Sequence, residues 1–278
     1  MLPKNDFLFK RIFGYEGNED ITKDLISNIL ERKIEKLEFK NPYLLRNIKE
    51  DKEEILDIKA ELDDGVQCDI EVQVANYHDV DRRILDYWAK MYRQSIGKSM
   101  YYKDMKKTIV ILIAYFDIDN LKDIEEYKTR WKIKEEKLNI ELTNVFELDI
   151  IEISKAEKML KAGTLQENNS QKAWLEFLIN PYSKEETKME NMSEEMKKAY
   201  EIWQNMNLSE EEREVAERRY KDLAALEYAK EYEFKQGEIS GEVRKQKEIA
   251  KKMLEKNMDI EIIIEITGLT KEEIEKLK

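Results

Sequence analysis

Apolar and polar residues alternate most clearly from Leu56 to Val74, a segment that reads LDIKAELDDGVQCDIEVQV. A period of two predicts β-strands, and the Asp63-Asp64-Gly65 sequence at its centre predicts a turn, so we expect a β-hairpin here. A two-residue turn would place each apolar residue of one strand opposite a polar residue of the other. A three-residue loop closed by Gly65 as a bulge instead makes one face wholly apolar. We therefore predict this second register, with the pairs Leu62–Val66, Ala60–Cys68, Ile58–Ile70 and Leu56–Val72.

Helical and strand patterns alternate along the first part of the chain. The expected helices cover Asn18–Glu31 and about Val80–Lys103, and the expected strands cover Ile34–Phe39, Thr108–Phe116 and Val145–Ile153. The strand TIVILIAYF is a continuous apolar run, which is typical of a strand buried on both faces. This order of elements indicates an α/β domain that ends near Leu160.

The pattern becomes wholly helical after a polar connection at 167–172. Ser209 and Glu212 have the spacing of a capping box, and we expect a long helix from there to about Glu233. The segment from Val243 to Lys278 predicts three short helices. We therefore expect a first domain over 1–162, a helical region over 163–236 and a small helical tail over 237–278.

Composition limits the chemistry that the chain can perform. Of the 278 residues, 41% are hydrophobic and 40% charged, with 8 Gly and 3 Pro, which favours a folded, helix-rich protein. A single cysteine excludes an intrachain disulfide and a cysteine zinc site, and a single histidine excludes histidine-rich metal sites. No apolar run approaches the roughly 18 residues of a membrane span, so we expect a cytoplasmic protein without membrane contact. Carboxylate chemistry is the class that the composition supports.

Two carboxylates face each other in the predicted hairpin. In the second register Asp57 lies across from Glu71, with Cβ atoms about 5 Å apart, and such a like-charge pair is destabilising by itself. A divalent cation would neutralise it, because Mg²⁺ binds one or two protein carboxylates together with waters and substrate phosphate. Gln73, on the same face, would orient a water molecule or a phosphate oxygen. The alternative is a solvated polar face with no metal.

Positive charge is concentrated directly after this hairpin. Between Val80 and Lys107 eight basic residues oppose three acidic ones, a net charge of +5 in a chain whose total is −12. Such a segment suits phosphate, so we expect Arg82 and Lys90 to contact DNA. The alternative is an ordinary solvated helix face.

Asp57 followed by Glu71-Val72-Gln73 resembles the active-site signature of the PD-(D/E)xK nuclease superfamily. More closely, the chain is similar to the Rpn family of recombination-promoting nucleases, which are often described as transposases. The stretches that carry the resemblance are NDFLFKRIFG, LDIKAELDDGVQCDIEVQV, RRILDYWAKMYRQSIGKSMYY, TIVILIAYF and IAKKMLEKNMDIEIIIEITGLTKEEIEKL. Their order along almost the whole chain makes the match specific, although no single motif is.

The resemblance implies a restriction-endonuclease-like α/β core, with a mixed central sheet flanked by helices, and a metal-dependent DNA endonuclease activity. Asp57 and Glu71 would bind Mg²⁺, with Mn²⁺ as the alternative ion, and Gln73 stands where the superfamily has a lysine. Rpn-like proteins commonly carry Gln there. Asp6 and Lys10 fall in the family's first motif, as a further metal ligand and a phosphate contact, with helix capping and surface charge as their alternatives. Arg83 and Tyr87 match its third motif and would contact substrate.

Other residues give weaker signals. Asp117 and Asp119 follow a buried strand and are more simply explained as loop caps, and His78 as a loop residue. Cys68 faces the apolar side and is expected in the core. The tyrosines and tryptophans are expected to be mostly core residues and not a base-stacking platform.

A second function class stays open. The chain would then be a catalytically inactive nuclease-fold protein that binds DNA or protein through its tail. Ile260–Leu277 fits a helix-turn-helix with Gly268 at the turn, but its acidic charge suits homodimerisation or regulation better than DNA reading. Recombination, mobile-element and phage-defence roles would all use the same nuclease site.

Overall fold

The computed structural model describes residues 3–40, 57–96, 101–183, 192–206 and 208–277. Contacts divide the chain into one unit over 1–220 and a second over 221–278. Helix α7 (Glu210–Glu255) contributes residues to both units. Each unit is described separately.

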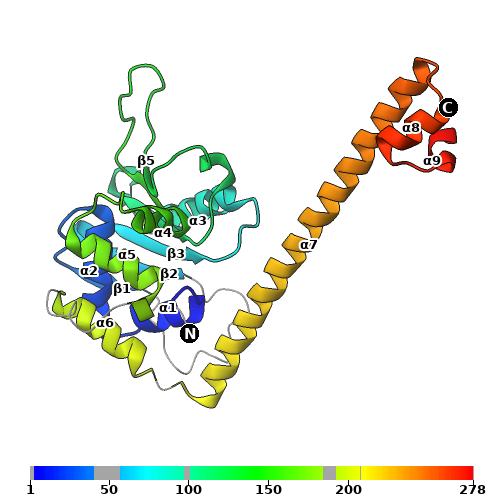
Figure 1. Ribbon diagram of the computed structural model, residues 1–278. Helices are drawn as coiled ribbons and strands as arrows, with labels where there is room; N and C mark the ends of the chain where they lie inside the picture. Colours follow the sequence, from blue (N-terminus) through cyan, green and yellow to red (C-terminus); the bar gives the residue numbers. More distant parts are fainter. Residues whose placement is uncertain (1–2, 41–56, 97–100, 184–191, 207, 278) are drawn as a thin grey trace. The chain divides into compact units, whose positions relative to one another are not determined.

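A mixed sheet forms the centre of the first unit (Figure 1). Its described strands are β1 (Leu37–Phe39), β2 (Asp57–Leu62), β3 (Gln67–Gln73), β4 (Thr108–Ala114), β5 (Lys128–Trp131) and β6 (Phe146–Glu152). The strand order is β1-β2-β3-β4-β6-β5, in which β3, β4 and β6 are parallel and the other neighbours are antiparallel. This arrangement confirms the predicted α/β class with a mixed central sheet.

The β2–β3 hairpin has the predicted register. Ala60 pairs with Cys68, Ile58 with Ile70 and Asp57 with Glu71, and the predicted Leu56–Val72 pair lies outside the described residues. The loop is a 3₁₀ turn, η2 (Asp63–Gly65), in which Gly65 has a φ of 75° as a bulge glycine requires. Asp64 also has a positive φ of 57°, so two consecutive loop residues adopt left-handed backbone conformations.

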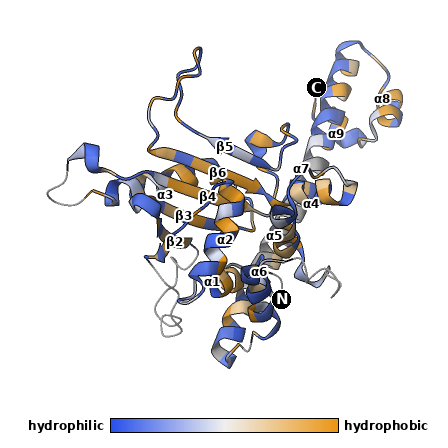
Figure 2. Cartoon of the chain, turned by 90° about the vertical axis from the view of Figure 1, so that its left-hand side faces the viewer, coloured by the Kyte–Doolittle hydropathy of each residue, from blue (hydrophilic) through white to orange (hydrophobic). Residues whose placement is uncertain are grey.

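The two faces of the sheet carry different layers (Figure 2). Ile58, Ile70 and Val72 pack in one cluster with α1 (Asp6–Phe13), α2 (Glu19–Leu30), α4 (Ile153–Ala162), α5 (Asn169–Ile179) and α6 (Glu194–Gln204). We call this side the α1 face. On the opposite side, the α3 face, Val110 and Leu112 pack with α3 (Val80–Gln94) and with apolar residues of β6. Because β4 is apolar on both sides, it is buried between the two layers, as predicted.

Helix α3 ends earlier than the sequence pattern indicated. We expected a helix to about Lys103, but α3 stops at Gln94 and the Ser95 hydroxyl donates a hydrogen bond of 2.7 Å to the Tyr92 carbonyl. Serine and the nearby Gly97 are weak helix formers, which explains the early end. The chain then forms a separate 3₁₀ turn, η3 (Tyr102–Asp104), before β4. Two further 3₁₀ turns are η4 (Asp119–Leu121) and η5 (Pro181–Ser183).

A two-stranded arm, residues 132–145, connects β5 to β6 (Figure 1). The Leu142 amide donates to the Ile133 carbonyl at 3.0 Å, and the Glu135 amide donates to the Ile140 carbonyl at 2.8 Å. This pairing places Ile133, Ile140 and Leu142 on one side of the arm, where all three are exposed. Lys132 and Glu141 form an ion pair of 3.0 Å on the other side. The arm is therefore ordered by its own contacts and presents an apolar side to solvent.

The second unit contains the end of α7 with α8 (Ile260–Thr267) and α9 (Lys271–Glu275). Ala250, Ile263 and Ile274 pack together as its small core. Gly268 has a φ of 68° and caps α8 in the left-handed conformation, and the Thr270–Glu273 capping box begins α9. The Ser209–Glu212 capping box is also confirmed, but α7 continues to Glu255 and not to about Glu233. No helix of the described residues has the length and apolar character needed to cross a membrane.

Two carboxylates of β6 are buried on the α1 face with opposite electrostatic consequences. Burial raises the pKa of Asp149 to about 6, although Arg130 donates to it at 2.7 Å. Burial would also raise the pKa of Glu147, but its hydrogen bond and charge pairing with Lys107 outweigh burial, so that this pKa lies below its usual value.

These opposite shifts predict opposite pH dependence. An unfolded Asp titrates near pH 3.9, so between about pH 4 and about pH 6 the folded chain binds more protons at Asp149 than the unfolded chain does, and stability falls as the pH rises. The Tm of Asp149→Asn minus that of wild type should therefore increase from pH 4 to pH 7. Glu147→Gln is the matched control: its difference should decrease as the pH rises through about 4. If the difference in Tm for Asp149→Asn stayed constant or decreased as the pH rises, the pKa of Asp149 would not be raised in the folded chain.

Candidate active site

Strand β3 carries three buried polar residues on the α3 face. Asp69, Glu71 and Gln73 alternate with the apolar residues of the α1 face and are each less than 7% exposed. Glu71 and Gln73 lie in register with Leu112 and Ala114 of β4, so they occupy the carboxyl half of two parallel strands. A buried carboxylate among aliphatic neighbours is costly unless it is paired or binds a cation.

Gln73 fixes the position of the Glu71 carboxylate. The Gln73 Nε2 amide donates to Glu71 Oε1 at 2.6 Å, and both side chains are buried. Hydrogen bonds to an ionised carboxylate are short and strong, so this contact orients Glu71. The amide oxygen of Gln73 is then the acceptor that this side chain can offer to a water molecule.

Asp57 lies opposite Glu71 in the strand register, as the sequence predicted, but its side chain lies outside the described residues. Among the side chains that are described, no group of three or more His, Cys, Asp or Glu residues could hold a metal ion. A pair of carboxylates from neighbouring strands is nevertheless a donor set that Mg²⁺ accepts, since this ion commonly keeps most of its waters. The residues present therefore fit a hydrated divalent cation.

Arg83 brings a fixed positive charge toward the same face. It lies in the first turns of α3, and its guanidinium donates to the Tyr87 hydroxyl at 2.9 Å and lies 5.6 Å from the centre of the Tyr77 ring. Burial alone would lower the pKa of Arg83, but the hydrogen bond with Tyr87 and the negative charges of Glu71 and Asp79 raise it overall. The structure thus pairs Arg83 with Tyr87 and places its charge within electrostatic range of Glu71.

Tyr77 and Asp79 are two members of this cluster that the sequence analysis missed. Both lie in the short connection between β3 and α3, and Asp79 is the residue before the first turn of α3. Asp79 precedes Arg83 by four residues, which is the spacing at which helical side chains interact. That spacing was a signal in the sequence, whereas the Tyr77 contact depends on the path of the loop.

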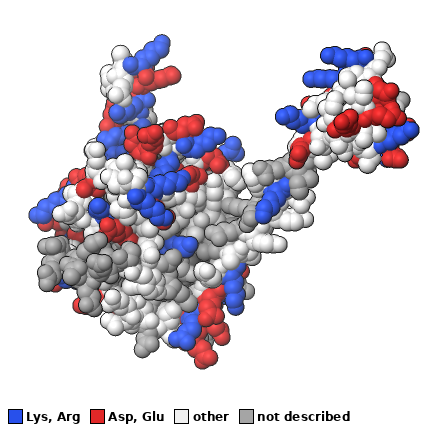
Figure 3. All heavy atoms as spheres, viewed as in Figure 1, with Lys and Arg blue, Asp and Glu red and all other residues white. Residues whose placement is uncertain are grey.

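Arg82 and Lys90 are exposed on α3. Their exposure suits contacts with a phosphate backbone. On the face that Figure 3 draws, basic and acidic side chains are interspersed over the first unit, so no large field of one sign covers it. Any DNA contact there would depend on particular side chains and less on net charge.

Asp6 and Lys10 belong to α1, which packs on the α1 face. Asn5 provides the N-cap of this helix, since its side chain accepts the Leu8 amide at 3.2 Å. The Asp6 side chain lies outside the described residues. Lys10 is only 6% exposed, so the alternative that it is an ordinary surface charge is wrong. Its predicted phosphate contact stays a prediction.

Polar side chains join the loops at the carboxyl ends of β3, β4 and β6. His78 Nδ1 lies 2.6 Å from Asp119, and Asp117 pairs with Lys158 at 2.7 Å, so both aspartates contact side chains of other segments. Below them, buried Glu152 accepts the Ile118 amide and pairs with Lys155, both at 2.7 Å. These contacts hold the loops that follow β3 and β4, next to Gln73 at the end of β3. Cys68 is fully buried, as expected, and burial raises the pKa of its thiol.

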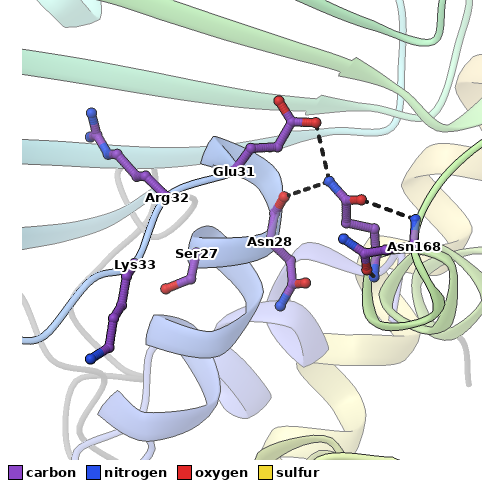
Figure 4. Close-up of a pocket in the computed structure, with 7 residues that line it drawn as sticks. Ser27, Asn28, Glu31, Arg32, Lys33 and Asn168 are labelled. Carbon is purple, nitrogen blue, oxygen red and sulfur yellow. Dashed lines mark hydrogen bonds between the residues drawn. The ribbon is translucent and has the colours of Figure 1, made fainter.

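A separate cavity of about 490 Å³ lies at the end of α2 and the start of α5 (Figure 4). Gln171 reaches across it and donates to the Asn28 carbonyl at 3.1 Å and to Glu31 at 3.3 Å. None of the predicted site residues lines this cavity. The hydrogen bonds of Gln171 join α5 to the end of α2 beside this cavity. The candidate active site lies on the opposite face of the sheet.

Two family comparisons match the chain. The family described as PD-(D/E)XK nuclease family transposase matches residues 3–233, and the Rpn/YhgA-like nuclease family, C-terminal HTH domain, matches residues 244–278. No curated protein and no solved structure matches the chain.

Proposed function

Because the chain belongs to the PD-(D/E)XK nuclease family of transposases, we propose that it is a divalent-metal-dependent endonuclease that hydrolyses phosphodiester bonds in DNA. The observation that carries the proposal is the β2–β3 register, in which Asp57 faces Glu71 while Gln73 holds the Glu71 carboxylate at 2.6 Å. The family match supports the class of reaction, and the register and hydrogen bond support the presence of the residues that this reaction needs.

In this proposal Asp57 and Glu71 hold Mg²⁺, with Mn²⁺ as the alternative, and Asp6 is a further candidate ligand. When bound, such an ion polarises a phosphodiester and lowers the pKa of a coordinated water. The chain's own groups then position the reactants: Gln73 keeps Glu71 in one orientation, and its amide oxygen accepts a hydrogen bond from the attacking water. Lys10 is a candidate phosphate contact from α1.

Arg83 and Tyr87 act on the substrate side of the site. The guanidinium is held by the Tyr87 hydroxyl and lies within the electrostatic reach of Glu71, so it can approach a phosphate bound to that carboxylate's metal. Arg82 and Lys90 extend the contact along the exposed side of α3. Residues 244–278, which match a helix-turn-helix domain, are a second segment that would bind DNA. Homodimerisation through the helical C-terminal region and a role in recombination, mobile elements or phage defence are further parts of the proposal.

Nicking of supercoiled plasmid by the wild-type chain tests the proposal. With Mg²⁺ we expect relaxed and then linear DNA, and with EDTA in excess we expect no change, because the carboxylates alone cannot activate water. Cleavage that persists in EDTA would contradict metal dependence.

The alternative is a catalytically inactive DNA-binding protein, which the helix-turn-helix match favours. Retention of plasmid in a gel shift without nicking in Mg²⁺ or Mn²⁺ would favour this alternative over the endonuclease.

A further inference from the structure

Two adjacent tyrosines are almost fully exposed at the start of β4. Tyr101 is 72% exposed and Tyr102 is 85% exposed, in and beside the η3 turn that connects α3 to the sheet. The sequence led us to expect tyrosines mostly in the core, and these two are exceptions. Single exposed aromatic residues are common, but two exposed aromatic residues side by side in the sequence are a candidate binding surface.

The backbone that carries these rings is fixed. The Asp104 amide donates to the Tyr101 carbonyl at 2.9 Å, and the Tyr101 amide donates back to the Asp104 carboxylate at 3.1 Å. Immediately after the turn, Lys107 pairs with Glu147 at 2.5 Å and anchors the segment to β6. The backbone of the turn is therefore held in place before any ligand arrives, and such preorganisation lowers the entropic cost of binding.

Positive charge accompanies the rings. Lys103 Nζ lies 5.4 Å from the centre of the Tyr101 ring, and Lys106 is exposed and donates to the Asp64 carbonyl at 3.4 Å. The nearby carboxylate of Asp104 is engaged by the turn itself. Aromatic faces combined with lysines are the combination that binds single-stranded nucleic acid, because unpaired bases stack and the lysines attract phosphates.

The position of this surface relates it to the candidate active site. Thr108 at the start of β4 pairs with Gln67, whereas Gln73 lies six residues further along β3. At about 3.3 Å per residue the two ends of the sheet are about 20 Å apart. Tyr101 and Tyr102 therefore precede the amino-terminal end of β4, whereas Glu71 and Gln73 lie in the carboxyl half of the neighbouring parallel strand β3.

We propose that Tyr101 and Tyr102, with Lys103 and Lys106, form a stacking platform for unpaired bases of a single-stranded DNA that extends to the candidate active site at Glu71. The DNA identity of the strand rests on the proposed function. Single-stranded rather than duplex DNA follows from the geometry, because paired bases do not offer their faces to side chains. The platform would hold the strand that leads into the site.

Fluorescence anisotropy with labelled oligothymidylate tests the platform. The full-length chain is titrated in EDTA, which prevents cleavage, with an oligonucleotide of about twelve nucleotides, a length within the usual site sizes for single-stranded DNA. Stacking contributes about 1–3 kcal/mol per base, so Tyr101→Ala/Tyr102→Ala should bind at least about tenfold more weakly. Tyr101→Phe/Tyr102→Phe keeps the rings and should bind within about twofold of wild type. Tyr220→Ala, which removes a tyrosine of 64% exposure on α7, is the matched control and should also bind normally.

Four results would overturn the platform: no binding by wild type, normal binding by the alanine variant, an equal loss in the phenylalanine variant, or an equal loss for duplex DNA. Tighter binding of oligouridylate would overturn its assignment to DNA. Plasmid nicking by the same preparations separates this inference from the nuclease. Nicking with normal oligothymidylate binding by the alanine variant rejects the platform alone, and lost binding without any wild-type nicking rejects the nuclease alone.

Discussion

Asp57→Ala and Glu71→Gln are each expected to abolish Mg²⁺-dependent nicking of supercoiled plasmid. Both remove a negative charge from the predicted metal site, and Glu71→Gln does so with almost no change of volume at a position that is 3% exposed. Loss of a metal's contribution to a developing phosphoryl charge is worth several kcal/mol, so we expect a rate loss of about a thousandfold or more. The nicking rate at saturating Mg²⁺ is the measurement. Wild type should also gain thermal stability from Mg²⁺, and both variants should lose that gain.

Glu61→Gln is the matched control for these variants. Glu61 lies on β2, on the same face of the hairpin, but pairs with Gln67 and Lys40 at the loop end. We expect it to nick at close to the wild-type rate. If Glu71→Gln nicked as fast as Glu61→Gln, Glu71 would not be a metal ligand.

Lys155→Ala should destabilise the first unit by about 3–5 kcal/mol, the usual cost of leaving one partner of a buried ion pair uncompensated. Glu152 is fully buried, and Lys155 provides its charge partner at 2.7 Å while also donating to the Leu121 carbonyl at 2.7 Å. Removal of the lysine leaves a buried carboxylate and an unsatisfied carbonyl. Urea unfolding, with the midpoint and slope fitted separately, measures the loss.

Two further variants make this prediction specific. Lys158→Ala removes an exposed pair with Asp117 from the same helix and should change stability by less than about 1 kcal/mol. Glu152→Gln/Lys155→Met removes both charges together and should recover much of the loss seen in Lys155→Ala. Equal effects of Lys155→Ala and Lys158→Ala would mean that burial of the Glu152 carboxylate carries no penalty.

The sequence predicted the hairpin register because side chains on a strand alternate with a fixed period of two. Once the loop length was chosen by the requirement for one apolar face, Ile58 had to meet Ile70 and Asp57 had to meet Glu71. No tertiary information was needed. The face that Glu71 and Gln73 share follows from the same rule.

Other features were not predicted, one because local weak helix formers were overlooked and two because they depend on distant contacts. Apolar spacing continued past Gln94, but the serine and glycine that follow ended α3, so its length was overestimated. The Arg83–Tyr77 contact joins a helix to a loop whose path no local pattern fixes. The burial of Lys10 likewise depends on how α1 packs against the rest of its unit, and its charge alone suggested an exposed position.

The arm between β5 and β6 has a consequence for the behaviour of the chain in concentrated solution. Its exposed Leu138, Ile140 and Leu142 extend from an edge strand, and such edges recruit further strands and seed aggregates. Lysines at 132, 134 and 137 alternate with the apolar residues of the arm, as gatekeeper residues do beside aggregation-prone segments. Solubility of the chain should therefore depend on the charge of these lysines, and conditions that screen charge, such as high salt, should promote its self-association.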